Sequence, residues 1–180
     1  MGTTTALMTV DEFLKLPGIE ERRVELIQGR VVDQEDEGFL HELVKSNLIH
    51  ILVIWLSQHR IGRVFAGTSY RVDEHDCLTP DISVLSSDRA NGKLQDLLQG
   101  APDLAIEIVS SETAAPLRTK IRLYLKHGSK AVWAVYPDER VIDLHSANGQ
   151  ITKLEQDQIL EDNDALPGFS TPVNAIFKGL

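Results

Sequence analysis

The sequence predicts an α/β fold, in which a mixed sheet is flanked by helices. The run from Leu104 to Val109 is apolar except for Glu107, which is typical of a central strand covered on both faces. Residues 39–60 carry apolar side chains at helical spacing. Glycine turns at Gly29 and Gly149 indicate antiparallel hairpins. Strands and helices mixed around hairpins favour a mixed sheet with helices on its faces.

The composition is that of a globular protein. The chain has 180 residues, 42% of them hydrophobic and 25% charged, which excludes a disordered or fibrous class. This length predicts one domain over residues 9–180, preceded by a tail at residues 1–8. The longest apolar run, Leu48 to Leu56, is short of the roughly 20 residues that span a bilayer, so no membrane segment is expected. No signal-like stretch is visible at the start, and a cytoplasmic location is expected.

Local signals predict the first elements. Thr9 followed by Glu12 is a capping box, which starts a short helix that ends at Pro17. Residues 22–32 read as a hairpin, and the longest helix follows at residues 39–60.

The second half alternates strands and helices. Pro116 opens a basic helix that runs to about His127, with Gly128 as its cap. The acidic residues near the C-terminus are expected to form a solvated face; they are Glu155, Asp157, Glu161, Asp162 and Asp164. The strands are predicted at residues 62–66, 69–72, 82–85, 104–109, 131–136, 141–145 and 151–154, with loop and a short helix at 87–100.

Two carboxylates stand out as candidates for chemistry. Glu107 lies inside an apolar strand, where a carboxylate needs a partner, either a cation or an arginine in an internal ion pair. Asp81 follows Pro80 at the start of another apolar strand and is either a turn residue or a neighbour of Glu107 in one cleft. Two adjacent carboxylates would suit a hard divalent cation such as magnesium.

These residues carry a family resemblance. Pro80-Asp81, the segment from Pro102 to Ser110, and Lys120 with Tyr124 before Gly128 resemble the Uma2 family (DUF820), a group of PD-(D/E)XK nuclease-like proteins abundant in cyanobacteria. The segment from Glu25 to Val31 and His41 add to the match, which covers about residues 9 to 175.

The resemblance implies a restriction endonuclease-like PD-(D/E)XK fold and a metal-dependent endonuclease that hydrolyses DNA phosphodiester bonds. Asp81 and Glu107 would be ligands of Mg²⁺ or Mn²⁺, and the backbone carbonyl of Ile108 or Val109 would complete the coordination. The cation would polarise the phosphate and lower the pKa of bound water.

The position of the candidate lysine differs from that in the superfamily motif. That motif has a lysine two residues after the glutamate, where this chain has Val109. Lys120 on the next helix is the best replacement, and its alternative is a solvated helix lysine. Glu25 could ligate the metal or hold its water, and His41 could act as acid, base or supporting partner; a purely structural role is the alternative for both.

The formal charge of −9 disfavours non-specific binding to nucleic acid, so DNA would need a local basic patch. The basic residues around one predicted helix could supply it, or they could simply pair with acids elsewhere; they are Arg118, Lys120, Arg122, Lys126 and Lys130.

Two other functions compete with a nuclease. One is a catalytically inactive nuclease-fold domain that binds nucleic acid or a protein partner. The other, a carboxylate-pair hydrolase of sugars, is disfavoured by the 6% aromatic content. A cysteine nucleophile is not expected, because Cys77 has no evident partner except the nearby His75. Cutting both DNA strands would suit a homodimer.

Overall fold

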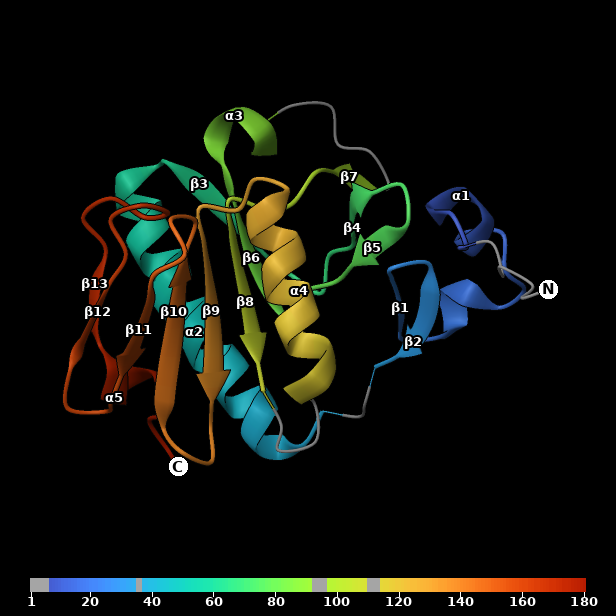
Figure 1. The fold of residues 1–180 in the computed structure, drawn as a ribbon. Coiled ribbons are helices and arrows are strands. Elements are labelled where there is room, and N and C mark those ends of the chain that lie inside the picture. Colours follow the sequence, from blue (N-terminus) through green and yellow to red (C-terminus); the bar gives the residue numbers. More distant parts are fainter. Residues whose placement is uncertain (1–6, 35–36, 92–96, 110–113) are drawn as a thin grey trace.

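A six-stranded mixed sheet forms the centre of the computed structural model, which describes residues 7–34, 37–91, 97–109 and 114–180 (Figure 1). The strand order is β11-β10-β9-β8-β6-β3. Only the central pair β8 and β9 is parallel, and the other neighbours are antiparallel. The predicted mixed sheet is therefore confirmed. Its strands are β3 (Gly62–Ala66), β6 (Ile82–Ser86), β8 (Leu104–Ile108), β9 (Ala131–Tyr136), β10 (Val141–Ser146) and β11 (Ile151–Leu154).

Two helices cover the opposite faces of this sheet, α2 (Phe39–His59) behind it and α4 (Ala114–Lys126) in front of it (Figure 1). Successive side chains of a strand point to opposite faces. In β8, Leu104 and Ile106 join the apolar cluster that contains α2, whereas Ala105 joins the cluster that contains α4. The same alternation places Glu107 on the α4 face.

A second, five-stranded sheet lies beside the first, with strand order β2-β1-β5-β4-β7. Its predicted hairpin turns at Gln28 and Gly29, whose φ angles of 51° and 70° fit the type I′ turn of a two-residue loop. A Cβ at Gly29 would also lie 2.6 Å from Cβ of Leu7, so glycine is required there. The strands are β1 (Val24–Ile27), β2 (Arg30–Asp33), β4 (Tyr70–Asp73), β5 (Asp76–Leu78) and β7 (Leu98–Gln99).

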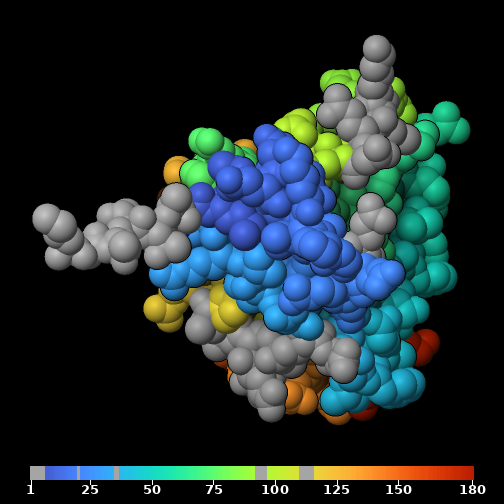
Figure 2. Space-filling view, turned by 90° about the vertical axis from the view of Figure 1, so that its right-hand side faces the viewer, coloured from blue at the N-terminus to red at the C-terminus, as the bar shows by residue number. Residues whose placement is uncertain are grey.

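The chain passes from the second sheet to the first through Thr79, Pro80 and Asp81, which connect β5 to β6. Figure 2 shows the side of the molecule on which the residues coloured blue, from α1 to β2, lie next to the cyan residues of α2. Asp81 therefore belongs to the junction between the two sheets.

The smaller elements follow local signals. The capping box of Thr9 and Glu12 is present at the start of α1 (Val10–Phe13), as predicted. Gly128 has a φ of 112° just after α4, which suits its predicted role as a cap. The other elements are the 3₁₀ helix η1 (Ile19–Glu21), α3 (Ser87–Ala90), β12 (Ile159–Glu161), β13 (Ser170–Pro172) and α5 (Val173–Ile176).

The prediction of a solvated acidic face is wrong for Asp162, which is only 3% exposed. Its carboxylate accepts hydrogen bonds from Nε1 of Trp133 at 2.8 Å and from the backbone N–H of Ala165 at 2.9 Å. These donors replace the water that the carboxylate loses, so Asp162 can be buried in the C-terminal part of the core.

Helix α2 is long and apolar enough to cross a membrane, judged by length and composition alone. The sequence predicted no membrane segment because the apolar run from Leu48 to Leu56 is short. The helix that contains this run is longer, with 21 residues. One face of the helix, with Val44, Leu48 and Leu52, packs in the core against the sheet. Because core helices pass the same test, this single helix is weak evidence for a membrane segment.

Candidate metal and catalytic site

Asp81 and Glu107 lie side by side on neighbouring strands. The antiparallel register pairs Ile82 with Ile106. Continued by one residue, this register sets Asp81 opposite Glu107 just before β6 begins, and the charge of Asp81 contributes to raising the pKa of Glu107. The Oδ2 atom of Asp81 accepts a hydrogen bond from the backbone N–H of Ile108 at 2.7 Å. The structure thus brings together the two carboxylates that the sequence singled out.

The buried partner of Glu107 is a lysine rather than an arginine. Glu107 is 8% exposed, and Nζ of Lys120 lies 2.8 Å from its Oε1 and 2.9 Å from its Oε2. The hydroxyl of Tyr124 donates to Oε1 at 2.8 Å. Lys120 and Tyr124 are one turn apart on α4, so they reach the sheet from the same helix face.

Lys120 also binds Glu25, which brings the N-terminal hairpin into the site. Its Nζ lies 2.9 Å from Oε1 of Glu25, and the same oxygen accepts the backbone N–H of Thr79 at 2.6 Å. Lys120 is only 6% exposed, so a solvated helix lysine is excluded. Three residues predicted separately, Glu25, Glu107 and Lys120, therefore form one buried ion cluster.

Burial and an excess of negative charge set the pKa values of this cluster. Burial raises the pKa of Glu107, and the charges of Asp81 and Glu25 add to this effect against the opposing charge of Lys120. Burial would lower the pKa of Lys120, but Glu107 and Glu25 outweigh it and raise that pKa above its usual value. The lysine is thus charged, and the carboxylates around it still favour a further cation.

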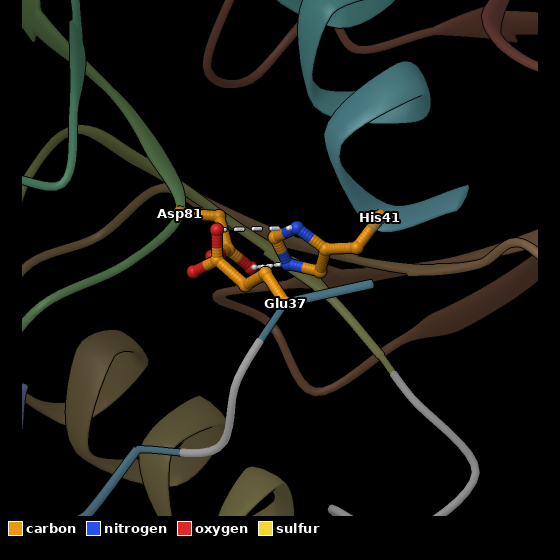
Figure 3. Close-up of side chains that lie close together, drawn as sticks. All are labelled: Glu37, His41 and Asp81. Atoms are coloured by element: carbon orange, nitrogen blue, oxygen red, sulfur yellow. Dashed lines mark ion pairs between the residues drawn. The ribbon is translucent and has the colours of Figure 1, made fainter. Parts of the chain in front are cut away.

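His41 contacts the outer side of Asp81 from the first turn of α2 (Figure 3). Its Nε2 lies 3.2 Å from Oδ2 of Asp81, and its Nδ1 lies 3.5 Å from Oε2 of Glu37. Burial would lower the pKa of His41, but the hydrogen bond and charge of Asp81, together with the charge of Glu37, raise it. One ligand-type atom from each of these three residues lies within 4.8 Å of the others.

Glu37 and Lys45 belong to the site but were missed in the sequence. Nζ of Lys45 lies 3.0 Å from Oε2 of Glu37 and 3.9 Å from Oδ1 of Asp81, and Arg23 binds Oε1 of Glu37. Despite the effect of burial, the hydrogen bonds that Lys45 and Arg23 donate to Glu37 lower its pKa to about 2. Polar residues at 37, 41 and 45 recur every four positions, which is the signal that could have revealed this face.

The donor set around Asp81 and Glu107 fits a hard divalent cation, because it offers carboxylate oxygens on adjacent strands. The backbone N–H and C=O of one strand residue point toward the same neighbouring strand. The N–H of Ile108 points to Asp81, whereas the N–H of Val109 bonds to the carbonyl of Val135 on β9. Of the two backbone carbonyls left open by the sequence, that of Ile108 therefore faces Asp81.

The cysteine chemistry disfavoured by the sequence finds no support in the structure. Burial, together with the charge of Glu25, raises the pKa of the Cys77 thiol to about 11, so the reactive thiolate is scarce. Nδ1 of His75 bonds to the backbone carbonyl of Met8 instead.

The basic residues predicted around α4 separate into different environments. Lys120 is buried in the site, and Lys130 lies 3.7 Å from Asp103. Arg118, Arg122 and Lys126 are exposed and four residues apart, so they share one outward-facing stripe of the helix.

A mixed sheet with helices on both faces, with carboxylates at the adjoining ends of two neighbouring strands and a buried lysine bound to one of them, defines a nuclease-like α/β fold. The Uma2 family model, described as "Putative restriction endonuclease", matches residues 10–174, and the chain belongs to this family. The fold and the family inferred from the sequence are thus confirmed.

A solved structure has the same fold. It is a "putative nuclease belonging to DUF820" from Anabaena variabilis ATCC 29413, which is 27% identical and superposes with a TM-score of 0.83. The match covers 94% of this chain and 97% of that chain. No curated protein matches the sequence.

Proposed function

We propose that this protein is a metal-dependent endonuclease that hydrolyses the phosphodiester bonds of DNA. The observation that carries the proposal is the meeting of Asp81, Glu107 and Lys120, with the lysine 2.8 Å and 2.9 Å from the two oxygens of Glu107. The family description and the name of the similar structure support a nuclease; the metal and the DNA substrate are proposed from the residues of the site.

Asp81, Glu107 and the carbonyl of Ile108 would hold the cation, Mg²⁺ or Mn²⁺. When bound, it would polarise a phosphate oxygen and lower the pKa of a water molecule. Lys120 would stabilise the negative charge that develops on the phosphate, because its own charge is maintained by Glu107 and Glu25. His41, whose Nε2 lies 3.2 Å from Oδ2 of Asp81, would exchange a proton near that carboxylate.

The inactive-domain alternative loses its main support. It rested on Val109, which occupies the position of the motif lysine, and on the acidic charge of the chain. Because Lys120 reaches Glu107 from α4, the missing lysine is no longer an argument against catalysis.

Cleavage of supercoiled and linear DNA by the purified protein tests the proposal. The reactions contain Mg²⁺, Mn²⁺ or EDTA, and the variants are Asp81→Asn and Glu107→Gln. Asp157→Asn is the matched control, since this aspartate is exposed in the turn before β12. Thermal unfolding checks that each variant folds.

We expect metal-dependent nicking that falls by at least about 100-fold in Asp81→Asn and Glu107→Gln, comparable with the loss of a major electrostatic group in other active sites. Asp157→Asn should cut like the wild type. Absence of cleavage on every substrate and metal, or full activity in both site variants, would refute the proposal.

A homodimer would place two such sites on one duplex. This remains a prediction, and light scattering of the protein with and without a DNA duplex tests it: a mass of one chain under both conditions would contradict it.

A further inference from the structure

A polar pocket of about 220 Å³ opens beside Asp81. Asp81, Glu37 and Lys45 line it together with Arg22 and Arg23, which precede β1. These residues come from three separate parts of the chain, which meet where the N-terminal hairpin approaches the start of α2 (Figure 2). None of the three basic residues was among the candidates identified in the sequence.

We propose that this pocket binds a second phosphate of the nucleic-acid backbone, next to the phosphate that is hydrolysed at Asp81 and Glu107. The inference rests on the proposed function. It names the residues that would position the nucleic-acid backbone so that the neighbouring phosphate lies at Asp81 and Glu107. Lys45 and Arg23 are its principal contacts, and Arg22 is a further cation at the rim.

The charge of the pocket favours an anion. Its lining carries Arg22, Arg23 and Lys45 against Glu37 and Asp81, in a chain whose formal charge is −9. Arg22 also pairs with Asp33 at 2.7 Å, so Arg23 and Lys45 are the cations on which the proposal depends. Phosphate is neutralised mainly by lysine and arginine in complexes with nucleic acid. A pocket with this balance, adjoining a candidate catalytic carboxylate, is therefore where an acidic protein could accept the backbone.

Glu37 holds the two principal cations in place. Its Oε2 binds Nζ of Lys45 at 3.0 Å, and its Oε1 binds Arg23. An ammonium has three donors and a guanidinium five, so both side chains keep donors for a ligand. Cations that are already oriented lose less conformational entropy when the ligand binds.

A metal site at Glu37, His41 and Asp81 is the competing interpretation of the same cluster (Figure 3). Lys45 and Arg23 already neutralise Glu37, and Lys45 also lies 3.9 Å from Asp81. A divalent cation placed there would be repelled by both basic groups, whereas a phosphate would be attracted by them.

A merely structural ion network is the other alternative. Arg22 and Arg23 have side chains that are 48% and 51% exposed. Ion pairs at such exposure contribute little to stability. The gathering of three cations beside Asp81 is better explained by a ligand than by folding.

DNA binding measured without cleavage tests the subsite. A short fluorescein-labelled DNA duplex is titrated with protein in EDTA, and its anisotropy is followed from about 50 to about 200 mM salt. The variants are Lys45→Gln and Arg23→Gln, with Lys45→Arg to restore the charge. Lys153→Gln is the control for the loss of one positive charge, because Lys153 lies on β11, at the far edge of the main sheet from the strands next to Asp81.

We expect Lys45→Gln and Arg23→Gln each to bind DNA about 10-fold more weakly and to lower the slope of log K against log salt by about 0.9, as loss of one phosphate contact requires. Lys45→Arg should restore most of the affinity, and Lys153→Gln should retain the wild-type slope. In cleavage assays, Lys45→Gln should raise KM more than it lowers kcat. A purely structural role would leave the salt slope unchanged.

Three outcomes would overturn the subsite: a wild-type protein that does not bind the duplex, unchanged affinity and slope in both variants, or an equal loss in Lys153→Gln. The nuclease proposal can fail separately. If the wild type binds DNA through Lys45 and Arg23 but cuts nothing with any metal, the subsite stands without the activity. If the variants bind and cut like the wild type, the activity stands without the subsite.

Discussion

Asp81 separates two ion networks that contain the same kinds of group but differ in their access to water. On the inner side, the side chains of Lys120 and Glu107 are 8% and 10% exposed. On the outer side, those of Lys45 and Glu37 are both 15% exposed and line an open pocket. A buried charge that loses its partner is left unsolvated, whereas a charge at a pocket can be compensated by water or by a ligand. The inner network is suited to holding fixed charges, and the outer network to exchanging partners.

Removing the lysine of each network should separate them most clearly. Lys120→Met leaves Glu107 and Glu25 buried without their cation and should lower the free energy of unfolding by about 3 to 5 kcal/mol. Lys45→Met should cost less than about 1 kcal/mol. Urea denaturation measures both values, and equal losses would show that the two networks do not differ as described.

Metal binding should depend on the inner side only. At 100 times its dissociation constant, Mg²⁺ or Mn²⁺ should stabilise the wild type by about 2.7 kcal/mol. Glu107→Gln should lose most of this stabilisation, and Lys45→Gln should keep it. Thermal unfolding with and without the metal provides the measurement. Stabilisation that survives Glu107→Gln and increases in Lys45→Gln would place the cation in the outer network instead, because Lys45 repels a cation there.

Removing a hydroxyl group that forms a hydrogen bond should also cost more stability in the inner network than in the outer pocket, although both losses are smaller than that for Lys120. Tyr124→Phe removes the 2.8 Å bond to the buried Glu107 and should cost about 2 kcal/mol, the range for a bond to a charged group. Ser69→Ala removes the 2.8 Å bond to Thr79 in the outer pocket and should cost about 0.5 to 1 kcal/mol. Chemical denaturation of both variants checks the order, which the opposite ranking would contradict.

The pH dependence of the outer network should be a small effect, comparable with the loss of the Ser69 hydrogen bond. The pKa of Glu37 is lowered from 4.5 to about 2, so its contribution to stability is present above pH 4.5 and is lost as the pH falls toward 2. Because the group is partly solvated, we expect this contribution to be only about 1 kcal/mol. Glu37→Gln should remove it at neutral pH and flatten the stability curve over that acidic range. Unfolding curves recorded across the range test this, and an unchanged slope would contradict it.

Local signals were sufficient for much of the fold. Thr9 and Glu12 formed the predicted capping box, and Gln28 with Gly29 formed the predicted hairpin turn. These features depend on hydrogen bonds and backbone conformations within a few residues, which the sequence shows directly. Asp162 was misjudged because its burial depends on Trp133, a distant residue on another strand.

The residues of the candidate site also fall into two groups, those that local sequence signals identified and those that only the tertiary structure revealed. Glu37 and Lys45 were missed because charged residues near a helix start are common on solvated surfaces, and only the approach of Arg23 and Asp81 makes them part of a pocket.

The sequence by itself determined that Glu107 lies in a buried strand and that Asp81 begins another, because side-chain alternation and apolar runs are local properties of the chain. Only the tertiary structure decided that Lys120 and Glu25 complete the cluster. Their contact requires α4 to pack on one face of the main sheet while the N-terminal hairpin closes beside it. The partner of a buried charge is selected by that packing, and no spacing along the chain specifies it.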